Sequence, residues 1–249
     1  MRKYFTTQVL PDPEKTADKL AHDLVGFIGE KLLQQENIFI ALSGGNSPQI
    51  LFKILKDIKH GEPDWSRVHF FWVDERCVPE SSRKSNFGNA YRLFFSKIDI
   101  PGKNLHPING DTNPEAEAVR YAHEMKTHLP VRDEIPVFDI ILLGMGEDGH
   151  TASIFPGVEI FAEKSQACAV STHPLSGQKR ITITEKVINN AKEVIFLVTG
   201  SSKAKPLQLI IENHKEAFLL PAKMIAPQNG NLAWYIDNAA AALLTDPKH

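Results

Sequence analysis

Apolar residues follow helical and strand periodicities in turn along the chain. Residues 12–35 carry apolar side chains at helical spacing behind an Asp-Pro-Glu start signal, which predicts a helix. The short apolar run Asn37–Leu42 predicts a buried strand. Helical spacing returns over residues 50–58, and the apolar run Val68–Val73 predicts a second buried strand.

The same alternation continues toward the C-terminus. A connector rich in Pro, Gly and Asn, Ile100–Asn113, separates two expected helices, and the second begins with a proline at a favourable first position. Near-continuous apolar strands that alternate with helices favour an α/β fold with a mainly parallel sheet covered on both faces. The chain shows no repeat, low-complexity segment or linker, so residues 1–249 are expected to form a single domain. The remaining helices are expected at 86–95, 114–129, 201–213 and in the tail 230–244, and the remaining strands at 138–143, 166–171, 180–184 and 193–198.

Composition and charge place the chain among ordinary globular proteins. Hydrophobic residues make up 42% of the 249 residues and charged residues 23%, which suffices for a substantial core. The formal net charge of −2 gives no overall basic field, so neither nucleic acid nor a membrane surface is an expected partner. A small anionic ligand would need local positive groups.

The two cysteines and the N-terminal residues predict a cytoplasmic protein. Cys77 and Cys168 are far apart and form no C-x-x-C pair, which favours reduced thiols over a disulfide or a metal site. The first 15 residues lack the apolar centre of a signal peptide, and no apolar run reaches membrane-spanning length.

Three predicted strands end in chemically unusual loops. SGGNSP follows Leu42, DER follows Val73, and GMGEDGH follows Leu143. In a parallel α/β sheet, ligands bind beyond the carboxyl ends of the strands. The sequence therefore predicts that these three loops meet at one crevice.

The SGGNSP loop is a candidate anion-binding site. Gly44 and Gly45 would let a ligand approach the backbone, Ser43 offers a hydroxyl group, and a helix that starts near Pro48 would present free N–H groups to a phosphate. It is not a Walker loop, because the required spacing and lysine are missing. The alternative is a simple strand-to-helix turn in which residue 46 or 47 is the N-cap.

Three basic residues could supply the positive charge. Arg76 lies just past a predicted strand end, where its planar guanidinium group could bind a phosphate, or could instead pair with the acidic residues of DER. Arg180 begins the run RITIT, and Lys203 stands at the expected start of a helix. Each could line the crevice or be a surface residue.

The loop GMGEDGH spells the G-x-G-x-x-G pattern, yet it fits a nicotinamide cofactor poorly. A dinucleotide loop is the first strand-to-helix turn and opens into a long helix. Here the loop lies mid-chain, and Pro156 and Gly157 would end any helix within two turns. The glycines more readily bend the loop so that Asp148 and His150 face the crevice.

His150 is the candidate general base, because a neutral imidazole can accept a proton near physiological pH. The alternative is a histidine that only forms structural hydrogen bonds. The chain has no H-x-x-x-H, H-x-H or C-x-x-C spacing, so no metal site is predicted.

Together these motifs resemble the 6-phosphogluconolactonases and their relatives, the glucosamine-6-phosphate deaminases. The deaminases have a glutamate five residues past the histidine of the DGH motif, where this chain has Phe155, whereas the lactonase branch has the S-L/I-F-P run found here. Residues 46 and 47 are Asn-Ser where the family more often has Ser-Thr, and both pairs can donate hydrogen bonds. The resemblance is carried, in order, by ALSGGNSP, FFWVDERCVP with SNFGNA, FDIILLGMGEDGHTASIFP, KRITIT and VTGSSKA.

The resemblance implies a Rossmann-like three-layer α/β sandwich and hydrolysis of 6-phospho-D-glucono-1,5-lactone to 6-phospho-D-gluconate, without metal or organic cofactor. His150 would activate water and Asp148 would orient it. A deaminase or isomerase, a non-catalytic sugar-phosphate-binding regulator and a nicotinamide enzyme remain as alternatives. A sugar-phosphate lactone is the expected small-molecule partner, and no oligomeric state follows. The implied phosphate-binding residues are Ser43, Gly44, Gly45, Arg76, Arg180 and Lys203.

Overall fold

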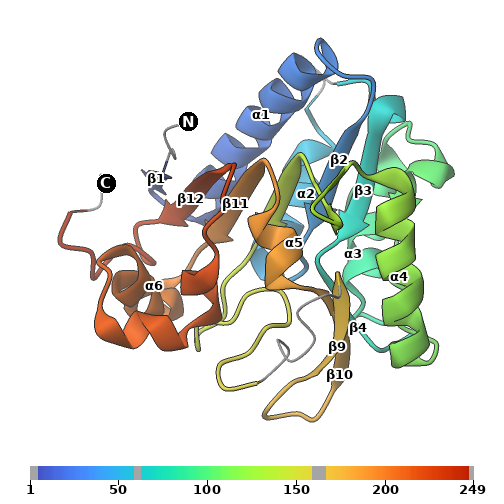
Figure 1. Ribbon diagram of the computed structural model, residues 1–249. Helices are drawn as coiled ribbons and strands as arrows, with labels where there is room; N and C mark the ends of the chain where they lie inside the picture. Colours follow the sequence, from blue (N-terminus) through green and yellow to red (C-terminus); the bar gives the residue numbers. More distant parts are fainter. Residues whose placement is uncertain (1–4, 59–62, 159–166, 247–249) are drawn as a thin grey trace.

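A seven-stranded sheet forms the centre of the fold (Figure 1), and every neighbouring pair of its strands is parallel. The computed structural model describes residues 5–58, 63–158 and 167–246. The sheet order is β1 (Phe5–Leu10), β12 (Asn231–Asp237), β11 (Glu193–Val198), β8 (Ile140–Leu143), β2 (Ile38–Leu42), β3 (Val68–Trp72) and β5 (Leu105–His106).

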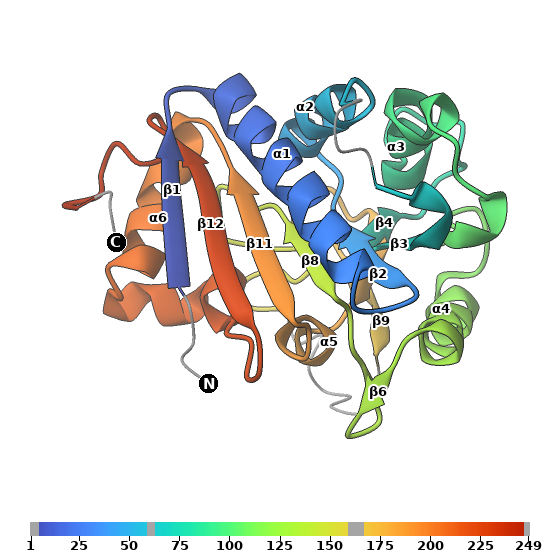
Figure 2. The same cartoon turned by 90° about the horizontal axis from the view of Figure 1, so that it is seen from above.

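Helices cover both faces of this sheet. Figures 1 and 2 show α1, α2 and α3 on one face and α4, α5 and α6 on the other, which confirms the expected three-layer arrangement. No described helix combines the length and the apolar character needed to span a lipid bilayer. The helices are α1 (Pro13–Leu32), α2 (Asn46–Leu55), α3 (Asn86–Leu93), α4 (Pro114–His128), α5 (Glu185–Asn189) and α6 (Ala204–Ile211), with short 3-10 turns at Trp65–Arg67, Phe95–Lys97, Gly102–Asn104, Ser201–Lys203, Lys215–Leu219 and Pro221–Met224.

A second, antiparallel sheet lies below the carboxyl ends of the main strands in Figure 1. It has the order β4 (Asp74–Arg76), β10 (Lys179–Ile183) and β9 (Cys168–Thr172). The chain passes into it at Val73, whose N–H donates to Leu42 of the main sheet and whose carbonyl accepts from Ile183. DER is therefore a short strand, and the expectation of a loop there is wrong. A two-stranded hairpin, β6 (Val131–Arg132) and β7 (Ile135–Pro136), completes the sheets.

One edge of the main sheet, formed by β1 and β12, differs most from expectation. The helix expected over Gly230–Leu244 is wrong, because this segment begins with strand β12, which lies between β1 and β11. Trp234 and Ile236 are buried as a strand between two neighbours requires. Strand β1 has few apolar residues and was not expected; it joins the sheet only through its pairing with the distant β12.

Candidate active site

A cavity of about 510 Å³ opens beyond the carboxyl ends of β2, β8 and β11. Residues from all three polar segments line it, together with the segment that follows β11, which confirms their expected convergence. Of the predicted site residues, Asp148 alone does not line the cavity. The others are Ser43, Gly44, Gly45, Arg76, His150, Arg180 and Lys203.

The loop after β2 exposes its backbone to the cavity and leads to the N-terminus of α2, which has no side-chain cap. Gly45 is the N-cap of α2, with φ of 109°, and no side chain caps this helix. The alternative of Asn46 or Ser47 as N-cap is therefore wrong, and the first N–H groups of α2 stay available to an anion. A side chain at Gly44 would collide with Asn86. The Ser43 hydroxyl donates to the carbonyl of Leu142 at 2.9 Å, so its proton is already used.

Arg76 and Arg180 are directly opposite each other in the ladder between β4 and β10. Their Nε atoms are buried and hydrogen-bond to no described group, although Arg76 Nη1 donates to the carbonyl of Lys84. Burial lowers the pKa of Arg180; Asp74 opposes this effect and Arg76 adds to it. Like charges directly opposite each other destabilise a sheet, and unpaired buried donors cost further free energy. An anion between the two guanidinium groups would relieve both costs.

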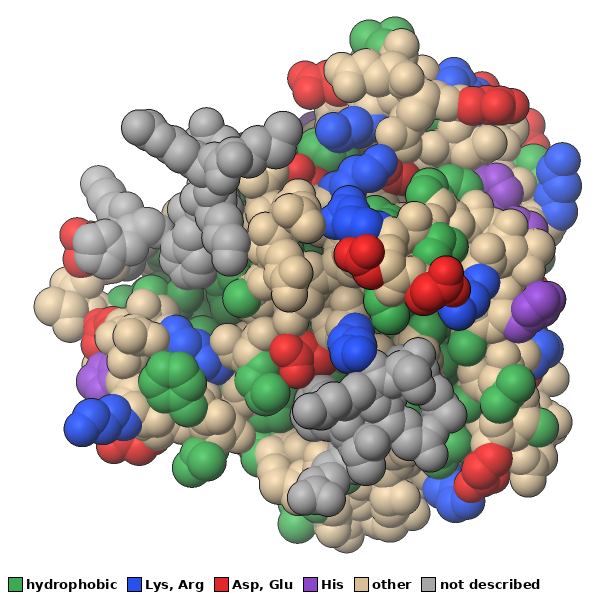
Figure 3. Space-filling view, viewed as in Figure 1, with side chains coloured by type: hydrophobic (Ala, Val, Ile, Leu, Met, Phe, Trp, Pro, Cys, Tyr) green, Lys and Arg blue, Asp and Glu red, His purple; other side chains and the backbone are tan. Residues whose placement is uncertain are grey.

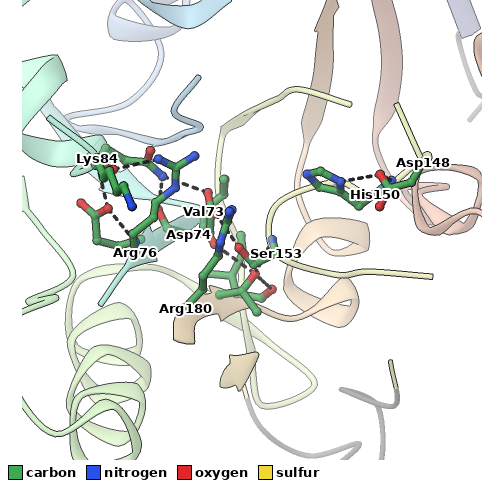
Figure 4. A network of polar contacts seen from close by, with 12 residues as sticks. Val73, Asp74, Arg76, Lys84, Asp148, His150, Ser153 and Arg180 are labelled. Carbon is green, nitrogen blue, oxygen red and sulfur yellow. Dashed lines mark hydrogen bonds and ion pairs between the residues drawn. The ribbon is translucent and has the colours of Figure 1, made fainter. Parts of the chain in front are cut away.

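Asp74 gives this basic pair a fixed negative neighbour. Its Oδ2 accepts from Ser153 Oγ at 2.7 Å and lies 3.9 Å from Arg180 Nη1, while its Oδ1 accepts from Asn86 Nδ2 at 3.2 Å (Figure 4). These contacts join four distant segments below the cavity. They also leave the remaining Arg180 donors free for a ligand.

Glu75 holds α3 in place at the same edge. Its carboxylate oxygens accept from the N–H groups of Asn86 and Phe87 and from the Ser85 hydroxyl. Burial raises the pKa of Glu75, although these hydrogen bonds oppose the rise. The carboxylate thus fixes the start of α3, and with it the Asn86 side chain at the cavity.

The loop after β8 presents the imidazole group of His150. The loop folds back on itself because Gly146 N–H donates to the His150 carbonyl at 2.8 Å and Gly149 has φ of 76°. Asp148 Oδ1 lies 2.5 Å from His150 Nδ1 and also accepts from the His150 N–H (Figure 4). Burial alone would raise the pKa of Asp148, but the hydrogen bond and charge of His150 lower it to about 2. The ionised carboxylate holds Nδ1, so Nε2 is the nitrogen free to accept a proton.

No helix follows this loop between Gly144 and Val158, unlike the loop of a dinucleotide-binding fold. Phe155 is fully buried, and its ring lies 4.8 Å from that of His150, centroid to centroid. The Arg180 guanidinium carbon lies 5.6 Å from the same Phe155 ring. This single phenyl group therefore supports both the imidazole and one of the two arginines.

Lys203 lines the same cavity from the segment after β11. It ends the 3-10 turn Ser201–Lys203, at the start of α6 as predicted. Among the described residues, its ammonium group forms no ion pair. Ser47 Oγ and Thr199 Oγ1 lie 2.7 Å apart and join this segment to α2. Figure 3 shows basic side chains (blue) grouped over the middle of this face of the molecule.

The sequence reasoning missed three residues of this site: Asp74, Asn86 and Ser153. Asn86 belongs to the SNFGNA motif and Ser153 to the run GMGEDGHTASIFP. Only folding brings both side chains into hydrogen-bonding contact with Asp74. Among the described residues, the cavity brings together no three His, Cys, Asp or Glu side chains at metal-binding distances.

Comparison with known proteins gives consistent relationships. Residues 11–234 match the family described as glucosamine-6-phosphate isomerases/6-phosphogluconolactonase. The 6-phosphogluconolactonase of Haemophilus influenzae is 40% identical, over 94% of this chain and 97% of that protein. The structure of the Trypanosoma brucei 6-phosphogluconolactonase is 28% identical, covers 98% of this chain and all of its own, and has a TM-score of 0.85. A monomeric glucosamine-6-phosphate deaminase, 21% identical with a TM-score of 0.80 over 96% of this chain and 99% of its own, shares the fold.

Proposed function

The chain belongs to the glucosamine-6-phosphate isomerase/6-phosphogluconolactonase family, and from this premise we propose that it hydrolyses 6-phospho-D-glucono-1,5-lactone to 6-phospho-D-gluconate, a carboxylic ester hydrolysis in the oxidative branch of the pentose phosphate pathway. The observation that carries the proposal is one cavity in which a carboxylate-oriented imidazole and two guanidinium groups with free donors meet.

The substrate phosphate is held at the basic side of the cavity. Arg76 and Arg180 line the cavity and offer their guanidinium donors to it, and Lys203 adds a third positive charge. The N–H groups at the start of α2, beside Gly44 and Gly45, face the same space. Phosphate binding then fixes the sugar ring and places its carbonyl carbon near His150.

His150 carries out the proton transfers. Its Nε2 takes a proton from water as the water oxygen attacks C1 of the lactone, which gives a tetrahedral intermediate. The imidazolium then returns that proton to the ring oxygen as the C1–O bond breaks, which gives a free hydroxyl group and a carboxylic acid, and the acid releases its proton to water to leave the carboxylate. Asp148 keeps Nδ1 protonated and stabilises the imidazolium, as the third member of a catalytic triad does.

Phe155 favours lactone hydrolysis over amino-sugar deamination. The fold alone does not separate the two reactions, because a deaminase shares it. A phenyl group cannot exchange protons, and Phe155 is enclosed beneath His150 where it can only support the ring. The chain therefore has no acid at the position where the resemblance places the deaminase glutamate.

The deciding experiment is timed lactone hydrolysis by the wild type and by His150→Ala, with the spontaneous rate subtracted. We expect the substitution to lower kcat by about 10²–10⁴-fold and to leave KM within a few-fold. Glucosamine 6-phosphate serves as the second substrate, with ammonia release measured, and we expect none. Ammonia release, or an unchanged kcat in a folded His150→Ala variant, would contradict the proposal.

The proposed location is the cytoplasm. Cys77 and Cys168 are both free thiols, and such thiols persist in a reducing compartment.

A further inference from the structure

Three histidines from distant parts of the chain meet away from the cavity. His69 belongs to β3, His106 to β5, and His128 is the last residue of α4. One nitrogen from each ring lies within 4.8 Å of the others, and His69 Nδ1 is 3.0 Å from His106 Nε2. None of the three lines the substrate cavity. Their separations of 37 and 22 residues explain why no short histidine spacing in the sequence indicated them.

Packing fixes the two inner rings of this cluster. The His106 ring stacks on Phe71 with centroids 4.2 Å apart and planes 9° apart, and the His69 ring lies 5.2 Å from that of Phe39. His106 Nδ1 is also 2.7 Å from Glu124 Oε1. A hydrogen bond from Nδ1 to a carboxylate leaves Nε2 as the lone-pair nitrogen, which is the usual arrangement of a metal-binding histidine.

Burial lowers the pKa values of the two inner rings. Burial is the largest cause for His69, and together with His106, His128 and Lys103 it brings that pKa to about 4. Burial also lowers the pKa of His106, while Glu124 opposes the shift and His128 and Arg120 add to it. Two nitrogens 3.0 Å apart can share one proton at most. Neutral imidazole is the form that binds a metal ion.

The spacing of the nitrogens suits a tetrahedral ion. Zinc–nitrogen bonds of about 2.0–2.1 Å place tetrahedral ligand atoms roughly 3.3 Å apart, close to the distance between His69 Nδ1 and His106 Nε2. The His128 side chain is 36% exposed at the end of its helix, and its Nε2 lies 3.3 Å from Glu124 Oε1, a contact that would be exchanged for a bond to the ion. Figure 3 shows histidine side chains (purple) at the surface on the flank where α4 lies.

We propose that His69, His106 and His128 form a zinc site, with the Glu124 carboxylate as the group that orients His106. Three imidazole nitrogens suit zinc among the common divalent ions, and calcium or magnesium would require oxygen ligands. The ion would join the end of α4 to β3 and β5. Its role would be structural, since the cluster lies outside the cavity and the lactone reaction does not need it.

Calorimetric titration of the untagged, EDTA-treated and desalted chain with zinc chloride tests this site. We expect one zinc ion per chain, and at a zinc concentration of about 100 Kd a rise in Tm of roughly 5–10 °C. His128→Gln and Glu124→Gln should each weaken binding by about tenfold or more and leave lactone hydrolysis unchanged. The matched control is His214→Gln, which removes an exposed histidine that lies 3.1 Å from Glu212 but has no further histidine beside it. This control should bind zinc as the wild type does.

Three outcomes would overturn the zinc site. The wild type could show no stoichiometric binding, which would leave the cluster as a hydrogen-bonded group only. His128→Gln and Glu124→Gln, folded by circular dichroism, could bind zinc with wild-type affinity. Zinc could inhibit lactone hydrolysis at the concentration at which it binds, which would place it in the cavity.

Discussion

At the scale of single residues, Gly146 decides where the His150 imidazole group can lie. A Cβ atom at this position would collide with His150 Nδ1 and would approach Asp148 Oδ1. We therefore expect Gly146→Ala to push the ring away from the substrate. A displacement of about 1 Å can cost about 10²-fold in rate, so kcat should fall by roughly that factor while KM changes little. Steady-state lactone hydrolysis measures both constants.

Gly144→Ala is the matched control for this prediction. Gly144 belongs to the same loop, but a Cβ atom there would meet nothing within 4 Å. We expect its kcat to stay within a few-fold of wild type. Equal losses of kcat in the two variants would mean that general loop disturbance, and not displacement of His150, limits the rate.

The Asp148–His150 contact also predicts a change of stability with pH. The pKa of Asp148 is lowered from 3.8 to about 2 in the folded chain, so the ionised carboxylate stabilises the fold. That contribution is complete above about pH 4 and is lost as the pH falls toward about 2. We expect the free energy of unfolding of the wild type to decrease over this interval more than that of Asp148→Asn. The difference should be modest, because the Asp148 side chain is 46% exposed. Urea titrations at both ends of the interval measure it, and parallel decreases would show that the pair does not stabilise the fold.

At the scale of elements, the pairing of β4 with β10 places two half-buried arginines opposite each other at the cavity. If both side chains bind the substrate phosphate as proposed, Arg180→Gln should impair binding, since each hydrogen bond to a charged group contributes about 1.5–3 kcal/mol. We expect KM for the phosphorylated lactone to rise about 10–100-fold, with kcat at saturation much less affected. Lys179→Gln, one residue earlier on β10, removes an exposed charge that pairs with Glu115 and should leave KM unchanged. A KM that does not respond to Arg180→Gln would remove this arginine from phosphate binding.

The strands of the main sheet show which parts of the fold can be predicted from the sequence. Buried strands such as β2, β3 and β8 have continuous apolar runs of the expected length, and the loops that follow them contain the recognisable chemistry. Strand β12 has a continuous apolar run, but the alanine-rich segment behind it favoured a helix. Strand β1 joins the sheet only through its pairing with β12. Long-range pairing of this kind leaves no local pattern in the sequence. The same holds for the contacts of Asn86 and Ser153 with Asp74 and for the cluster of three histidines.

At the scale of the whole molecule, the cavity depends on the last strand of the sheet. Asp237 ends β12 and is buried, and its carboxylate accepts from the N–H of Gly200 at 3.0 and 3.1 Å and from that of Ala240 at 2.8 Å. Gly200 has φ of 97° and directly precedes the 3-10 turn that ends at Lys203. A residue near the C-terminus thereby fixes a cationic side chain at the cavity, although it does not line the cavity itself.

Asp237→Ala should therefore affect both stability and substrate binding. It leaves one buried and one partly buried N–H group without an acceptor, at about 1–3 kcal/mol for each, so we expect the free energy of unfolding to fall by roughly 2–6 kcal/mol. Release of the segment before Lys203 should also raise KM for the phosphorylated lactone several-fold, since the ammonium group would no longer be fixed near the phosphate. Urea titration and steady-state kinetics measure the two effects, and Asn238→Ala, at the exposed neighbouring position, should change neither. A loss of stability with an unchanged KM would show that Lys203 is positioned by other contacts, and that the influence of the C-terminal strand on the site ends with folding.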